Sequence, residues 1–183
     1  MARMVIDGFG QIELNNVAFR RDGRIEAQCA LSTVDFASVP AENGMILVVK
    51  KADHEICFAD ASAENQLYAL NYTSEHMYDE RKPGLKNFAT YAHVNGKDDF
   101  YPRVGYLSAG DLWTTNCVDL GAYASADAVA SALASGAVYA AVGTQGAPVI
   151  QAAAPSVGPV MQVIKKTTMP DGQDAFQLQV LKV

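Results

Sequence analysis

Histidines, cysteines and paired acidic residues are the side chains of this sequence that could bind a metal or take part in catalysis. His54, His76 and His93 show none of the HxH, HExxH or HxxxH spacings that bring two imidazoles to one metal. His54 and Cys57 are three residues apart, and in a strand such residues point to opposite faces of the sheet. We therefore expect surface histidines, with neither a metal site nor a bound cofactor.

Motifs for nucleophilic catalysis or phosphate binding do not occur. The sequence contains no GxSxG, SxxK or papain-like cysteine pattern, and no GxxxxGK[ST] or GxGxxG loop. Asp98 and Asp99 are adjacent, so in a strand their carboxylates cannot flank one substrate as acid and base. The stretch NGKDDF also lacks the ligand spacing of a calcium loop. On these grounds we expect a protein that is not an enzyme.

The stretch FYPRVGYLSAGDLWTTN, residues 100–116, concentrates aromatic, glycine and charged residues. We interpret it as two strands joined by a turn at Gly110-Asp111. The Asp111 carboxylate would then accept hydrogen bonds from nearby backbone N–H groups. Gly105 would leave room for a bulky neighbour such as Trp113. The density of special residues in this stretch therefore indicates requirements of folding, not of catalysis.

Alternation of apolar and polar residues, with turn signals between the runs, dominates the chain. Asp22-Gly23 predicts a hairpin between a strand containing Val17 and Phe19 and a strand that starts at residue 25. The apolar run at 44–51 is typical of a strand covered on both faces. Further strands are expected at 55–60, 67–73, 87–94, 112–118, 160–164 and 176–181, with turns at Asn95-Gly96 and at Pro170-Asp171-Gly172.

The segment at about 125–135 breaks the alternation and is predicted to be a helix. Ser125 is a good N-cap, Asp127 is favourable in the first turn, and Gly136 is a natural stop. The predicted fold is therefore mainly β: an antiparallel β-sandwich or small barrel with one short α-helix and an extended N-terminal arm.

Length, charge and cysteine content restrict the class of protein. The 183 residues suit an N-terminal arm and hairpin over 1–34 and a single β-rich domain with a helical insertion over 35–183. The net charge of −6 argues against a nucleic-acid partner, which would need an excess of Lys and Arg. No window has the character of a membrane span or a signal peptide. Because Cys29, Cys57 and Cys117 form no CxxC motif, we expect reduced, buried thiols.

Arg20, Arg21 and Arg24 form the local basic cluster of the sequence. They flank the turn at Asp22-Gly23, where two interpretations stay open. The arginines are either a solvated hairpin tip or a contact for an acidic partner surface. Arg103, with the aromatic residues around it, is a further candidate for an interface.

Several stretches resemble structural proteins of tailed bacteriophages. VPAENGMILVVKKADHEICFADASAENQLYALNY (39–72) is similar to a stretch of capsid decoration or cement proteins, in which a Gly-led apolar strand precedes a polar turn and a second strand. FYPRVGYLSAGDLWTTN, KPGLKNFA (82–89) and TTMPDGQDAFQLQV (167–180) also resemble stretches of phage structural proteins. The resemblance covers about 35–180.

This resemblance implies a viral structural protein, made in the host bacterial cytoplasm and located in the virion. Such a protein would bind the outer surface of the major capsid lattice and stabilise the phage head. The implied partners are the major capsid protein and further copies of the chain, with a trimer favoured, and no nucleic acid or membrane. Another virion component (a head-fibre base, a tail part or an internal head protein) is an alternative. A β-barrel ligand-binding protein or enzyme is less favoured. It would need a concave pocket with convergent polar groups, and a pocket that contains Asp111, Arg103 and a histidine together would favour it.

Virion proteins commonly gain stability by burying an extended arm against a neighbour, and the N-terminal segment suits that role. An arm that folds on docking loses conformational entropy but covers much surface. The expected interface residues are Phe9, Ile12, Leu14, Phe19, Arg20, Arg21, Arg24 and Arg103.

Overall fold

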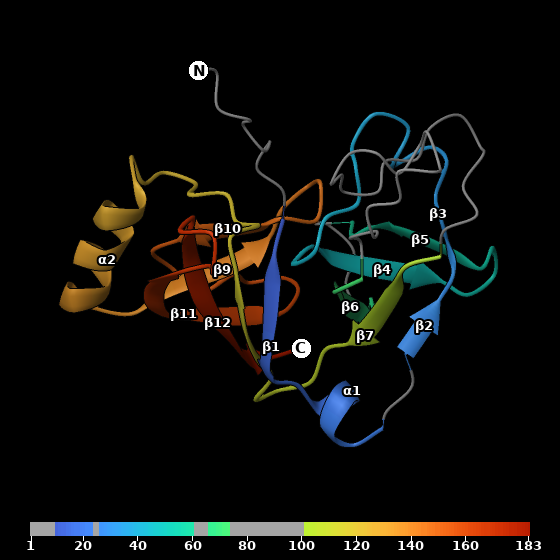
Figure 1. Cartoon of the computed structure of the whole chain (residues 1–183), viewed down its shortest axis with the longest axis horizontal. Coiled ribbons are helices and arrows are strands. Elements are labelled where there is room, and N and C mark those ends of the chain that lie inside the picture. The colour runs from blue at the N-terminus through green and yellow to red at the C-terminus, as the bar shows by residue number, and fades with distance from the viewer. Residues whose placement is uncertain (1–9, 24–25, 61–65, 74–100) are drawn as a thin grey trace.

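The structure, a computed structural model, describes residues 10–23, 26–60, 66–73 and 101–183, which form two β-sheets and two helices (Figure 1). Sheet A contains, in spatial order, β1 (Ile12–Asn16), β8 (Leu112–Thr115), β12 (Asp174–Lys182), β11 (Val160–Thr168), β9 (Val138–Val142) and β10 (Pro148–Gln151). Sheet B contains β2 (Glu26–Gln28), β7 (Arg103–Tyr106), β6 (Tyr68–Asn71), β4 (Ile46–Lys50), β5 (Glu55–Phe58) and β3 (Ala30–Leu31). The helices are α1 (Ala18–Arg21) and α2 (Ala126–Ser135). The predicted fold class, mainly β with one short helix, is confirmed.

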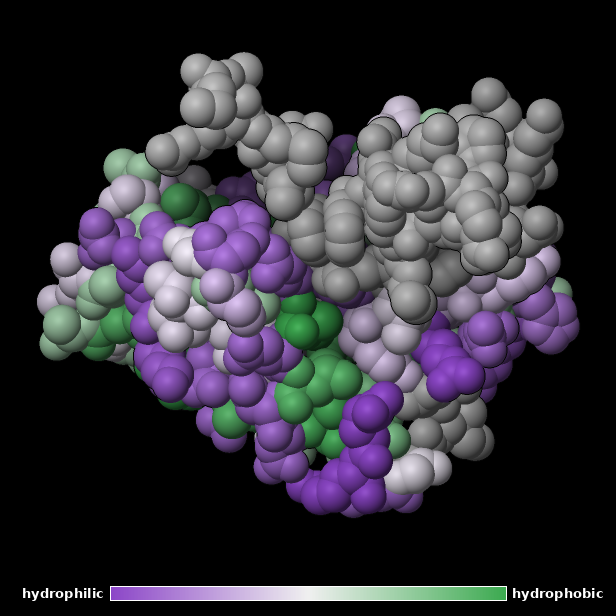
Figure 2. All heavy atoms as spheres, in the orientation of Figure 1, coloured by the Kyte–Doolittle hydropathy of each residue, from purple (hydrophilic) through white to green (hydrophobic). Residues whose placement is uncertain are grey.

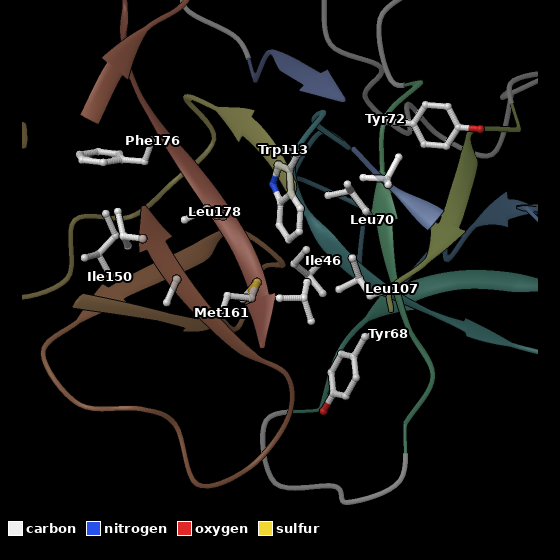
Figure 3. Packing of buried hydrophobic residues seen from close by; sticks show 14 of the residues in the cluster. Ile46, Tyr68, Leu70, Tyr72, Leu107, Trp113, Ile150, Met161, Phe176 and Leu178 are labelled. Carbon is white, nitrogen blue, oxygen red and sulfur yellow. The ribbon is translucent and has the colours of Figure 1, made fainter. Parts of the chain in front are cut away.

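The core between the two sheets is built from residues that alternate along their strands. Sheet A contributes Trp113 and Leu178, and sheet B contributes Ile46 and Leu70, all fully buried in one cluster (Figure 3). Val129 of α2 belongs to the same cluster, because α2 packs against β11 and β9 at the end of sheet A away from sheet B (Figure 1). One continuous core therefore joins both sheets and the helix.

Strand β4 is buried on both of its faces, as its unbroken apolar sequence predicts. Ile46 faces the cluster between the sheets. Leu47, the next residue, faces a second cluster that includes Phe36 and Ile56. This second cluster covers the other face of sheet B, so a strand with alternating polar residues would not fit at this position.

The predicted turn at Pro170-Asp171-Gly172 and the predicted ends of the helix at about 125–135 are confirmed. In the turn between β11 and β12 the Met169 N–H donates to the Gln173 carbonyl at 2.8 Å, and Gly172 has a φ of +88°. That left-handed backbone favours glycine. At the start of α2 the Ser125 hydroxyl accepts a hydrogen bond from the Ala128 N–H at 3.2 Å. The helix then ends at Gly136, as expected.

The predicted hairpin around Asp22-Gly23 is wrong. Residues 18–21 form one turn of helix, and β1 pairs with β8, while β2 pairs with β7 of the other sheet. The reason is visible in the burial: Val17, Ala18 and Phe19 are all buried in succession, which a helical turn permits and a period-two strand does not. The described part of segment 1–34 is thus built into both sheets.

Strands β9 (VYAAV) and β10 (PVIQ) were not predicted, because both are short and lie in an alanine-rich segment that shows no clear alternation of apolar and polar residues. The strand expected at 87–94 and its Asn95-Gly96 turn lie outside the described residues. Within the described ranges, neither helix has the length and apolarity needed to cross a membrane.

Candidate functional site

A groove of about 290 Å³ runs between edge strand β1 and helix α1. It brings together Leu14, Arg20 and Arg21, three of the residues that the sequence placed at an interface. Figure 2 shows green, hydrophobic spheres on this side of the molecule, next to strongly purple, hydrophilic ones. The full lining is Leu14, Asn15, Asn16, Val17, Arg20 and Arg21. The groove is therefore lined by two apolar residues, two asparagines and two arginines.

Helix α1 has four residues, too few to be stable alone, and Asp111 holds it in place. Its N-cap residue, Val17, has no side chain that can accept a hydrogen bond. Instead the Asp111 carboxylate accepts from the Ala18 N–H at 2.7 Å and from the Ser108 N–H at 2.7 Å. Asp111 is 2 % exposed. The expectation that this carboxylate binds backbone N–H groups is confirmed, and one of its two donors is 93 residues away in the sequence.

Phe19 anchors α1 to sheet B and is not available to a partner in this structure. It is 1 % exposed, and its ring lies 5.2 Å from the ring of Tyr72, centroid to centroid. A Cβ atom placed on Gly105 would lie 2.4 Å from this ring. The neighbour that Gly105 accommodates is therefore Phe19, and not Trp113 as the sequence suggested.

The two arginines of α1 differ in their surroundings. The Arg21 guanidinium binds the Asp22 carboxylate at 2.8 Å and the Asn16 side-chain oxygen at 3.2 Å. The hydrogen bond to Asp22 and its negative charge raise the pKa of Arg21. The Arg20 guanidinium carbon lies 5.9 Å from the centre of the Tyr72 ring, a cation–π arrangement. Within the described ranges Arg20 has no ion pair, so its charge is available to an anionic group.

The other expected interface residues are not part of the groove. Ile12 is half-buried and packs against the core cluster. Arg103 is exposed at the start of β7, where its backbone N–H and carbonyl both bind the Thr73 hydroxyl. Phe9 and Arg24 lie outside the described residues.

Sequence reasoning missed Asn15 and Asn16, which line the groove, and Tyr72, whose ring lies beside the Arg20 guanidinium. Asn16 binds Arg21, and Tyr72 lies under Arg20. The signal for Tyr72 was an aromatic residue at the end of a buried strand, but only the fold shows which cation it meets. The paired asparagines at 15 and 16 could have indicated an edge strand, because polar residues protect exposed sheet edges.

A second cleft, of about 390 Å³, lies where the 154–158 loop approaches Ala59 and Tyr68 of the other sheet. The Tyr68 hydroxyl and the Gln151 amide are its side-chain groups with the strongest hydrogen-bonding capacity, and none of its lining residues is charged. The lining is Ala59, Tyr68, Ala141, Val142, Gln151, Ala154, Pro155, Ser156, Val157 and Gly158.

Neither hollow has the composition of a catalytic pocket. Neither is lined by Asp111, Arg103 or His54. Among the described residues no group of three or more His, Cys, Asp or Glu side chains is placed to hold a metal ion. Burial raises the pKa of the Cys117 thiol to about 12 and also raises that of Cys57, so both thiols stay protonated at neutral pH.

The chain was compared with protein-family models, with curated proteins and with solved structures, and none of them matched it. The candidate site therefore depends on the geometry of its own residues.

Proposed function

We propose that this chain is a capsid decoration protein that binds the outer surface of the major capsid lattice of a tailed bacteriophage and stabilises the head. The observation that carries the proposal is the groove beside β1, where Leu14, Arg20 and Arg21 converge. It occurs in a chain whose residues 35–180 resemble phage head proteins in sequence. The β-rich architecture is compatible with that resemblance.

The charge of the groove favours a protein partner with acidic side chains. The chain as a whole carries a net charge of −6, so two arginines in one groove beside Leu14 and Val17 differ in character from its average surface. Arg20 is oriented by the Tyr72 ring and has no ion pair within the described ranges. An oriented, unpaired guanidinium binds a carboxylate at low entropic cost.

The proposal is tested by co-sedimentation with empty heads, assembled from the major capsid protein of the genome that encodes this chain. We expect the protein to sediment with the heads, and the double variant Arg20→Glu/Arg21→Glu to bind at least about tenfold more weakly. Lys182→Glu is the control, because it also replaces an exposed cation by an anion but lies outside the groove. No affinity of the wild-type protein for heads or capsid subunits would overturn the proposal.

Electron microscopy of particles with the protein labelled separates the head surface from other positions in the virion. A label over the whole shell is the expected result. A label confined to one vertex, to the tail or to the interior would instead favour a head-fibre base, a tail component or an internal head protein.

A further inference from the structure

The face of sheet A that points away from the core is polar but almost free of charge. Along β12, Phe176, Leu178 and Val180 are buried in the core cluster. The residues between them, Gln177 and Gln179, point to the opposite face, as does Leu181, which is 45 % exposed.

One row of this outer face crosses all six strands without a charged side chain. The pairing registers connect Asn16 to Leu112, Leu112 to Gln179, Gln179 to Gln162, Gln162 to Tyr139, and Tyr139 to Gln151. The adjacent row contains the charges of Glu13, paired with Thr114, and Lys165, paired with Gln177. In a chain with 34 charged Lys, Arg, Asp and Glu side chains (14 basic and 20 acidic), an uncharged row of this length is distinctive.

The central side chains of the row have unused hydrogen-bonding capacity. Gln162, Gln179 and Tyr139 are half-buried by their neighbours, and their side chains form no hydrogen bond within the described ranges. Each amide carries two N–H donors and an oxygen acceptor, and a hydroxyl carries one donor and two lone pairs. A surface of this kind is complementary to another surface of the same kind.

We propose that the outer face of sheet A binds a second copy of this chain across a twofold axis. A twofold contact presents the same patch twice, so the patch must be complementary to itself. Amide side chains fulfil this condition because each one carries both donors and an acceptor, so an amide of one copy can donate to and accept from an amide of the other. Two chains of net charge −6 repel each other, and this repulsion is weakest where the facing surfaces are uncharged. Leu181 adds apolar area that a second copy would cover.

The size of the face sets the expected affinity. Six strands about 4.8 Å apart, with some five residues each at about 3.3 Å, give a footprint on the order of 500 Å² per copy. Stable interfaces bury about 800 Å² per partner. We therefore expect a dimer that forms in the micromolar range. This arrangement differs from the trimer that the resemblance favours, and it does not depend on the proposed function.

Sedimentation velocity of the full chain, from low-micromolar to submillimolar concentration, tests the proposal. We expect the wild-type protein to pass from monomer to dimer. Gln179→Lys and Gln179→Glu should each weaken the dimer at least about tenfold, because like charges then face each other near the axis. Thr144→Lys is the control, since it adds a charge in the exposed turn between β9 and β10 and should dimerise as the wild type does.

An equimolar mixture of Gln179→Lys and Gln179→Glu should dimerise again, because opposite charges then face each other, and a misfolded variant would not be rescued in this way. A wild-type chain that stays monomeric over the whole range would overturn the proposal. A trimer, dimerisation unaffected by either charge variant, or failure of the mixture to associate would overturn it as well.

Discussion

Asp111 illustrates how a residue with the chemistry of a catalytic acid is used to hold a fold together. Its carboxylate accepts two backbone hydrogen bonds, from Ala18 and Ser108. Asp111→Ala would leave both N–H groups without this acceptor in a buried site, so we expect a loss of about 2–3 kcal/mol in the free energy of unfolding. Urea unfolding measures this loss. Asp119→Ala, which removes an exposed carboxylate bonded to the Gly121 N–H, should cost less than about 1 kcal/mol. Equal losses in the two variants would show that Asp111 has no special role.

Gly105 allows a second test at the scale of a single residue. A Cβ atom there would overlap the Phe19 ring at 2.4 Å, and both residues are buried. Gly105→Ala should therefore cost about 1–3 kcal/mol through overpacking. Gly136→Ala is a matched control, since no atom lies within 4 Å of the added carbon and the backbone is extended there. Urea midpoints that fall equally in both variants would contradict the packing of Phe19 on Gly105.

Glu42 gives the molecule a predictable dependence on pH. Burial raises the pKa of its carboxyl, despite hydrogen bonds to Gly10 and Cys117 that act in the opposite direction. Because the folded pKa lies above the unfolded one, the folded state retains the proton to higher pH, and the contribution of Glu42 to stability falls as pH rises through that window. Glu42→Gln should remove this part of the pH dependence. Urea unfolding of both proteins at several pH values from 4 to 7 measures this effect. As the pH rises, we expect the urea midpoint of Glu42→Gln to increase relative to that of the wild type. A constant difference would contradict it.

Helix α2 is an element whose ends are set by side chains that the sequence shows plainly. Ser125 caps its N-terminus, whereas the Ser131 hydroxyl donates to the Asp127 carbonyl within the helix. Ser125→Ala should destabilise the protein by about 1 kcal/mol, because an N–H group of the first turn loses its acceptor. Ser131→Ala should be neutral or slightly stabilising, since alanine is the better helix former. Thermal unfolding of both variants measures these changes in stability. A larger loss of stability in Ser131→Ala than in Ser125→Ala would contradict the assigned cap.

The elements that sequence reasoning predicted correctly are those whose signal is local. The apolar run of β4, the turn at Gly172 and the cap at Ser125 each depend on a few consecutive residues. Helix α1 could not be predicted, because its N-terminal cap comes from Asp111 and its anchor site from Gly105, both far along the chain. The groove was predicted only in part, because the sequence showed the arginines but not their position. They lie beside Leu14 only because α1 forms, and α1 depends on residues far along the chain.

At the scale of the whole molecule, the first strands connect the two sheets. β1 lies at the edge of sheet A, whereas β2 and β3 lie in sheet B, so residues 10–34 cross from one sheet to the other. The backbone adds a further link, because the Ile46 N–H of sheet B donates to the Gly146 carbonyl in the turn between β9 and β10 of sheet A. The sheets also share the core around Trp113. Neither sheet can therefore lose its packing without exposing apolar surface of the other.

This coupling predicts a single cooperative unfolding transition. Trp113 is the one tryptophan of the chain and is fully buried between the sheets, so its fluorescence reports on their packing, while far-UV circular dichroism reports on all strands together. Both signals should change at the same urea concentration, as two-state behaviour requires. If residues 1–34 were an independent arm, their removal would leave the Trp113 transition unchanged. Because Val17 and Phe19 belong to the Trp113 cluster, we expect the chain lacking residues 1–34 to lose that transition altogether.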